Sequence, residues 1–130
     1  MNTALNIDPF QSVPPHNYLG FYDDKHYYPK KVADWLDYSP RDVSKIAQVP
    51  VARVRWDKQM PKEISDRMRE IGNICEIVAG YFGGDVQKTA TWFQVPNPMF
   101  GNLSPKDMIR YGRYKKVLQL IQSAIAGDVP

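Results

Sequence analysis

The chain has 130 residues, with 17 Lys and Arg against 14 Asp and Glu, which gives a formal net charge of +3. This length suits a single domain with a modest core. A hydrophobic fraction of 43% excludes a chain that is disordered throughout. The slightly basic balance, with a pI near 9.0, permits nucleic-acid binding without requiring it.

The cysteine count and the lengths of the apolar runs narrow the class of protein further. Cys75 is the only cysteine, so no internal disulfide can form, and its apolar neighbours predict a small buried side chain. No apolar run approaches the roughly 20 residues of a transmembrane helix. The N-terminus lacks the basic start and apolar run of a secretory signal. We therefore expect a cytoplasmic protein with no membrane partner.

Residues 1–28 show no helical period and contain three prolines. Aromatic residues gather between Tyr18 and Tyr28, which is unusual for a disordered tail. We expect an N-terminal arm that is loose before about Tyr18 and packs on the body of the protein after it. His16 and His26 lack neighbouring ligands, so no metal site is expected.

From Pro29 the apolar spacing becomes helical and predicts helices over about 29–37 and 40–48. Ser39-Pro40-Arg41-Asp42 matches a cap, a first-turn proline and a capping-box acid at the start of the second helix. The Val51–Trp56 segment is then expected to form a third short helix. Two short helices and a tight turn give a helix-turn-helix outline.

Three further helices are predicted over about 61–81, 86–93 and 105–126. Ile64, Met68, Ile71, Cys75 and Val78 form an amphipathic stripe on the first of these, whose expected role is core packing. The sequence therefore predicts an all-α fold of about six helices with no sheet beyond a trivial hairpin. The expected core residues are Ile71, Val78, Val117 and Ile121, on helices that are also expected to form a homodimer contact.

The segment from Trp92 to Arg113 carries the strongest local signals. Pro96 and Pro98 stiffen a loop that also presents Met99 and Phe100. This loop is either a helix–helix connection whose Phe100 packs into its own core or a preordered binding loop. Trp92, Gly101, Ser104 and Pro105 are the expected structural residues, because they prop the loop, permit its turn and start the next helix.

The order of residues in this segment resembles the toxin-binding domain of the Xre/MbcA/ParS antitoxin family. The shared order is Trp92, a Pro-Asn-Pro turn, a glycine, Ser-Pro and a helix with Gly112 and Val117. The resemblance covers about residues 70–126, and its order and spacing are more specific than any single dipeptide.

Two features depart from the family pattern. Gly101-Asn102 stands where relatives tend to have paired glycines, and Asn tolerates the left-handed conformation that the turn requires. Tyr111 and Tyr114 lie on the last helix, so its partner surface can differ from that of relatives.

The resemblance implies an antitoxin of a type II toxin–antitoxin system. It implies a partner toxin with a RES-type domain that consumes NAD, whose active site the antitoxin covers. Lys106, Arg110 and Arg113 are four and three residues apart and are expected to share one helix face. The candidate toxin-binding residues are Pro96, Asn97, Pro98, Met99, Phe100, Lys106, Arg110 and Arg113.

The helix-turn-helix outline predicts binding to operator DNA, and the resemblance adds that many family members repress their own operon. A recognition helix reads base edges in the major groove while Lys and Arg neutralise phosphates. The candidate DNA-binding residues are Arg41, Lys45, Ala52, Arg53, Arg55 and Lys58. The glycine common in the turn of this motif is absent, and acidic Asp42 and Asp57 dilute the basic patch.

Enzyme motifs are missing from the sequence: it has no phosphate-binding glycine loop, no Cys-x-x-Cys and no His–carboxylate cluster. We expect no catalytic residues, no metal and no cofactor. The predicted organisation is an arm over 1–28, a DNA-binding part over 29–60 and a toxin-binding and dimerisation part over 61–130. The main alternative is a stand-alone transcriptional regulator whose C-terminal half only dimerises, and a weaker one is a small enzyme or scaffold that uses the last helix.

Overall fold

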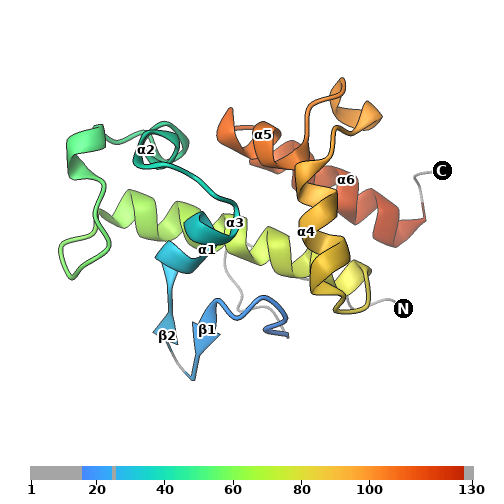
Figure 1. Ribbon diagram of the computed structural model, residues 1–130, viewed down its shortest axis with the longest axis horizontal. Helices are drawn as coiled ribbons and strands as arrows, with labels where there is room; N and C mark the ends of the chain where they lie inside the picture. The colour runs from blue at the N-terminus through green and yellow to red at the C-terminus, as the bar shows by residue number, and fades with distance from the viewer. Residues whose placement is uncertain (1–15, 25, 128–130) are drawn as a thin grey trace.

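A computed structural model describes residues 16–24 and 26–127, and Figure 1 shows their arrangement. Within these residues the chain forms six α-helices, two single-turn 3-10 helices and one two-stranded antiparallel hairpin. The elements are β1 (Tyr22–Asp23), β2 (His26–Tyr27), α1 (Pro29–Trp35), α2 (Pro40–Ala47), η2 (Val51–Arg53), α3 (Lys62–Tyr81), α4 (Val86–Gln94), η3 (Pro98–Phe100), α5 (Pro105–Arg110) and α6 (Tyr114–Ala126). The predicted all-α fold with no more than a small hairpin is confirmed.

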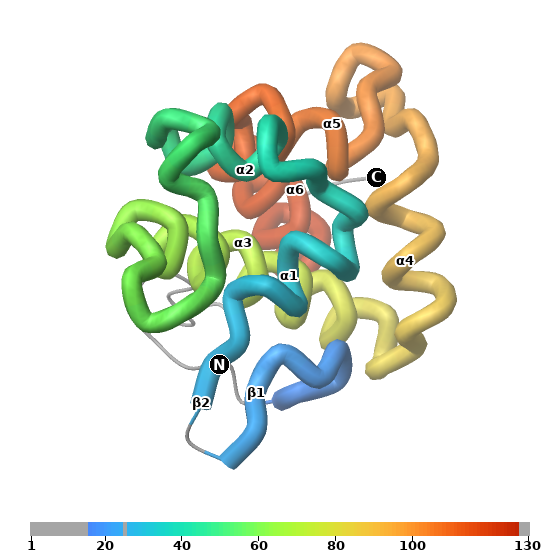
Figure 2. Tube along the Cα trace, turned by 60° about the vertical axis from the view of Figure 1, so that its left-hand side comes forward, coloured from blue at the N-terminus to red at the C-terminus, as the bar shows by residue number. Residues whose placement is uncertain are grey.

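Helix α3 is the axis of the fold. Its 20 residues carry the apolar stripe seen in the sequence, and α1, α2, α4 and α6 all pack against it (Figures 1 and 2). Residues from both ends of the chain share the resulting hydrophobic core. The four expected core residues are confirmed, because each is at most 2% exposed: Ile71, Val78, Val117 and Ile121.

The two Ser-Pro helix starts form as predicted but differ in detail. Ser39 Oγ accepts from the backbone N–H of Asp42, whose carboxylate accepts from the Ser39 N–H in return. This is a complete capping box. Ser104 Oγ likewise accepts from the backbone N–H of Asp107 at 3.0 Å, but the Asp107 carboxylate pairs with Arg110.

The single helix predicted over about 105–126 is wrong, because two helices occupy this range. The backbone breaks at Gly112, whose φ of +82° lies in the left-handed region. The Gly112 N–H donates to Ile109 O at 2.9 Å and the Arg113 N–H donates to Met108 O at 2.8 Å, a pattern that ends a helix. The apolar spacing runs on through this break, so periodicity alone could not reveal it.

The prediction of a third short helix over Val51–Trp56 is also wrong, in both the type and the length of the helix. Only Val51–Arg53 forms a 3-10 turn, and Val54 is already extended with φ −73° and ψ 112°. Pro50 precedes the turn, and the β-branched Val51 and Val54 have weak helix propensity. The predicted count of six α-helices therefore holds for the described residues, although their identities differ from those expected.

The arm between Tyr18 and Tyr28 packs on the body, as predicted, while its residues before His16 lie outside those described. Phe21 is 1% exposed, and Tyr27 Oη donates to Met68 O at 2.8 Å. Buried Glu76 on α3 accepts from the Tyr18 N–H at 2.9 Å and from the N–H of the next residue at 2.8 Å. Burial raises the pKa of the Glu76 carboxyl, although these two hydrogen bonds oppose the shift.

Candidate functional site

The loop between α4 and α5 is ordered by the backbone and side chain of Asn97. The Asn97 N–H donates to Leu103 O at 3.0 Å, and Asn97 O accepts from the N–H groups of Phe100 and Asn102. Its side-chain Oδ1 accepts from the Met99 N–H at 2.9 Å. These four hydrogen bonds to Asn97 fix the shape of the loop, although the loop lies on the surface of the protein.

The loop turns at Gly101 and Asn102, with φ of +63° and +68°. Both lie in the left-handed region, where Asn is one of the few tolerated non-glycine residues. Trp92 is half-buried in the last turn of α4, just before the loop, with its ring edge-on to Phe93 at 5.1 Å between centroids and to Phe82 at 6.5 Å. This aromatic contact joins the end of α4 to the core.

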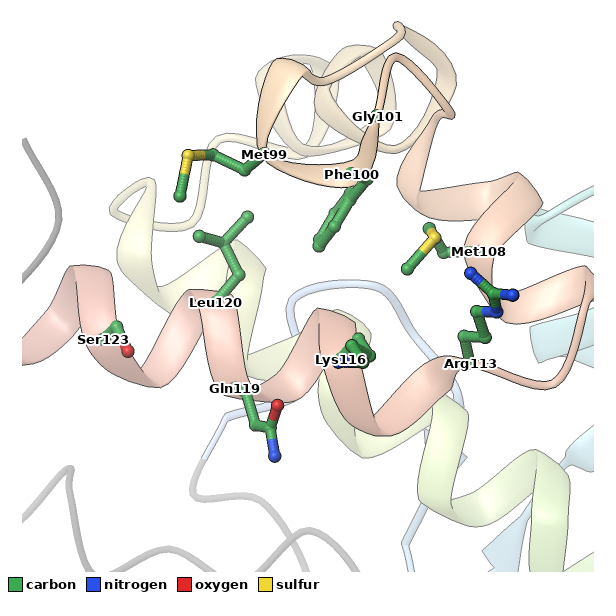
Figure 3. Close-up of a pocket in the computed structure, with 9 residues that line it drawn as sticks. All are labelled: Met99, Phe100, Gly101, Met108, Arg113, Lys116, Gln119, Leu120 and Ser123. Carbon is green, nitrogen blue, oxygen red and sulfur yellow. The ribbon is translucent and has the colours of Figure 1, made fainter.

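A groove of about 490 Å³ opens between η3 and α6. In Figure 3, Phe100 projects from the turn toward α6, and Leu120 projects from α6 toward the turn. Met108 and Arg113 lie together at one end of the groove. Met99 is 61% exposed at its rim, while Phe100 is half-buried and packs against the core. The loop is thus a packed connection that also presents an exposed apolar side chain, and its role as a binding loop stays a prediction.

The structure brings together only part of the predicted toxin-binding set. Met99, Phe100 and Arg113 line the groove, whereas Lys106 and Arg110 do not. Pro96 and Pro98 are exposed and Asn97 is half-buried.

The expected common face of Lys106, Arg110 and Arg113 is wrong, because α5 ends at Arg110 and Arg113 is the residue that precedes α6. The break at Gly112 therefore separates Arg113 from the other two cations. It turns Arg113 toward the groove instead (Figure 3).

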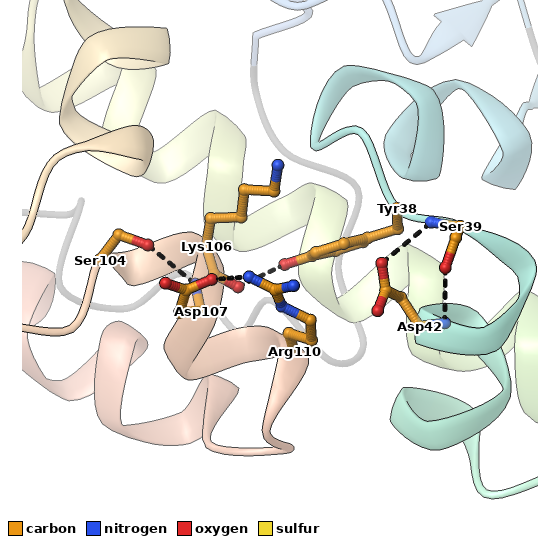
Figure 4. A network of polar contacts seen from close by, with 7 residues as sticks. All are labelled: Tyr38, Ser39, Asp42, Ser104, Lys106, Asp107 and Arg110. Atoms are coloured by element: carbon orange, nitrogen blue, oxygen red, sulfur yellow. Dashed lines mark hydrogen bonds and ion pairs between the residues drawn. The ribbon is translucent and has the colours of Figure 1, made fainter.

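Lys106 and Arg110 belong to a polar network that joins α5 to the start of α2 (Figure 4). Tyr38 Oη donates to Lys106 O at 2.8 Å across 68 positions of sequence. Tyr38 is 8% exposed, and burial raises its pKa, so the hydroxyl remains a donor. Arg110 forms an ion pair with Asp107. The Tyr38–Lys106 hydrogen bond holds the start of α2 against α5, the helix that follows the loop.

The predicted DNA-binding residues are all exposed. Arg41 and Lys45 lie on α2, Ala52 and Arg53 on η2, and Arg55 and Lys58 in the connection to α3. Arg55 donates to both carboxylate oxygens of Asp57, at 2.8 and 2.5 Å. This pairing lowers the pKa of the Asp57 carboxyl. No α-helix follows α2 at the position of a recognition helix within the described part of this segment.

Other site classes find no support in the described residues. Among residues 16–24 and 26–127, no group of three or more His, Cys, Asp or Glu is placed to hold a metal ion. Within the same ranges, no helix is both long and apolar enough to cross a bilayer. Cys75 is a buried free thiol whose pKa is raised by burial, which is the opposite of a reactive cysteine.

The chain is similar to antitoxins. The matched proteins are the mycobacterial cidal antitoxin MbcA from Mycobacterium bovis and from two strains of Mycobacterium tuberculosis. Each is 29% identical over 98 residues, which cover 75% of this chain and 79% of the relative. No protein-family model matches the chain, and no solved structure matches it. The similarity supports the resemblance to MbcA antitoxins, while the Xre and ParS parts of that expectation stay a prediction.

Sequence reasoning missed five residues of the groove: Met108, Lys116, Gln119, Leu120 and Ser123. All five lie in the range predicted as one helix, where apolar residues covered more than one side. The excess apolar width was the available signal, because a helix that is apolar beyond its core-facing stripe must be enclosed or lie at an interface. Which of these residues face the loop depends on the helix break at Gly112, which the apolar pattern does not reveal.

Proposed function

We propose that this chain is the antitoxin of a type II toxin–antitoxin system and that it neutralises a RES-type, NAD-consuming toxin by covering the active site of that toxin. The observation that supports the antitoxin role is the similarity to MbcA over 98 residues, whereas the RES-type toxin is what the family resemblance of the sequence implies. On this proposal the chain acts as an inhibitor and not as an enzyme.

The geometry of the loop is compatible with this role. Binding costs free energy for every segment that must be ordered on association. The Asn97 hydrogen bonds have already ordered the loop that presents Met99, so little further ordering is needed. Aromatic, Met and Arg side chains are enriched at interfaces, and Met99, Phe100 and Arg113 meet at one groove.

The test is co-expression with the neighbouring reading frame, which is the candidate toxin gene. We expect wild type to restore growth and to co-purify with the toxin, and Met99→Glu to do neither. Val86→Glu is the matched control, because Val86 is also an exposed apolar residue but lies at the far end of α4. An acid is tolerated there in the first turn of a helix.

Rescue by Met99→Glu as complete as by wild type would show that the loop is not the toxin contact. Point variants are needed because a chain ending at Asn102 would lose the core residues Ile109 and Val117 along with the groove. Failure of the truncated chain would therefore report unfolding and not the loss of a contact.

Repression of its own operon, homodimerisation and the three-part division of the chain stay predictions. Repression rests on the exposed cations Arg41, Lys45, Arg53, Arg55 and Lys58. A stand-alone regulator remains the alternative function, and the absence of any co-purifying product of the neighbouring reading frame would favour it.

A further inference from the structure

The groove between η3 and α6 combines an apolar interior with positive charge at one end. Phe100 and Leu120 face each other across it, and Met108 closes one end. Arg113 and Lys116 also line it and are exposed. None of its lining residues, all of which belong to the described part of the chain, is acidic.

The nearest carboxylate in sequence is already engaged. Asp107 forms an ion pair with Arg110 on α5 and does not line the groove. Arg113 and Lys116 are therefore not neutralised from within the groove. Their side chains remain the charges that an incoming partner meets there.

An apolar interior next to two cations favours a ligand that is partly apolar and partly acidic. A purely apolar segment would cover Arg113 and Lys116 and remove water from their charged groups. It would offer no hydrogen-bond acceptor in place of that water, so its binding would cost free energy. A simple anion would leave the apolar faces of Phe100 and Leu120 in water. A segment with an apolar side chain beside a carboxylate satisfies both halves of the groove at once.

We propose that the groove receives a segment of the toxin that carries an apolar side chain next to one or more carboxylates. The apolar side chain lies between Phe100 and Leu120, and the carboxylate pairs with Arg113 and Lys116. This inference rests on the proposed function, and it names the partner chemistry at the same site. The groove is open to solvent, and its volume of about 490 Å³ is large enough to take a side chain.

The experiment measures the affinity of the full-length chain for the purified product of the neighbouring reading frame by isothermal titration calorimetry at low and high salt. Lys116→Glu reverses a groove charge, and Leu120→Ala empties the apolar half. Lys115→Glu is the matched control, because Lys115 is the adjacent exposed lysine on α6 but does not line the groove. Circular dichroism of each variant establishes that it is folded.

We expect Lys116→Glu and Leu120→Ala each to weaken binding by about 10- to 100-fold. Lys115→Glu should stay within about twofold of wild type, since exposed charges away from a contact contribute little. Wild-type affinity should fall as salt rises, and Lys116→Glu should flatten that dependence.

Three results would overturn the proposal, and they are distinguishable. If Lys116→Glu and Leu120→Ala bind like wild type while Met99→Glu, at the exposed rim, still abolishes binding, the proposed ligand of the groove interior is wrong but the antitoxin function stands. Sedimentation showing that Lys116→Glu and Leu120→Ala disrupt a homodimer and leave toxin binding intact would assign the groove to a second copy of this chain. No binding by wild type itself would overturn both the groove ligand and the proposed function.

Discussion

Replacing Gly112 by alanine tests the break between α5 and α6, because a broken and a continuous helix predict opposite signs. With φ of +82°, Gly112 occupies a region that costs an alanine about 1–2 kcal/mol. Alanine also has less backbone freedom than glycine in the unfolded chain, which stabilises the folded state by about 0.4–1 kcal/mol. Apart from Gly112 and its two chain neighbours, no described heavy atom lies within 4 Å of the position that a Cβ would take, so no clash adds to this cost. We expect Gly112→Ala to lower the free energy of unfolding by about 1 kcal/mol.

The same substitution in a continuous helix would raise the free energy of unfolding by about 0.5–1 kcal/mol, because glycine is a poor helix former. Gly80→Ala supplies the matched control inside α3. The nearest atom to its added Cβ is a Tyr18 ring carbon at 3.9 Å, an ordinary contact, so this variant should be stabilised. Urea unfolding followed by circular dichroism at 222 nm measures both variants. A Gly112→Ala variant more stable than wild type would refute the broken helix.

Three further predictions address the core, the arm and the basic segment. Ile71→Ala should cost about 2–5 kcal/mol in urea unfolding, because Ile71 is fully buried on α3; an effect within about 0.5 kcal/mol would contradict that placement. Because burial raises the Glu76 pKa above its usual 4.5, the folded state binds a proton more tightly, so stability should fall as pH rises from that value through the raised pKa. Glu76→Gln should flatten this slope in unfolding curves recorded at several pH values, and an unchanged slope would refute the assignment. The Arg53→Ala, Arg55→Ala double variant should lose the salt-sensitive gel shift of its own promoter, and a shift equal to wild type would exclude this segment as the DNA reader.

The sequence predicted those features whose causes are local. Ser39 and Ser104 start helices because their hydroxyls cap backbone groups three residues away. The α3 stripe repeats at helical spacing and is buried throughout. Asn97 holds the loop through contacts within six residues, so its residue type was informative.

Features that depend on distant partners or on a choice between conformations were not predictable. A glycine such as Gly112 is tolerated within a helix and also ends one, and the surrounding apolar pattern is the same in both cases. Glu76 accepts a hydrogen bond from the N–H of Tyr18, which lies 58 positions away in the sequence. The groove is lined by residues of η3, α5 and α6, elements that the sequence pattern did not place side by side.

The single core around α3 also bears on how the protein is removed from a cell. Residues of all six α-helices in the described ranges contribute to that core, so we expect these ranges to unfold as one cooperative unit. A protease that captures the transiently open chain then destroys the groove and the basic segment near η2 in the same event. We expect no degradation product that keeps one surface and loses the other. One unfolding equilibrium would therefore set the lifetime of every activity that the chain carries.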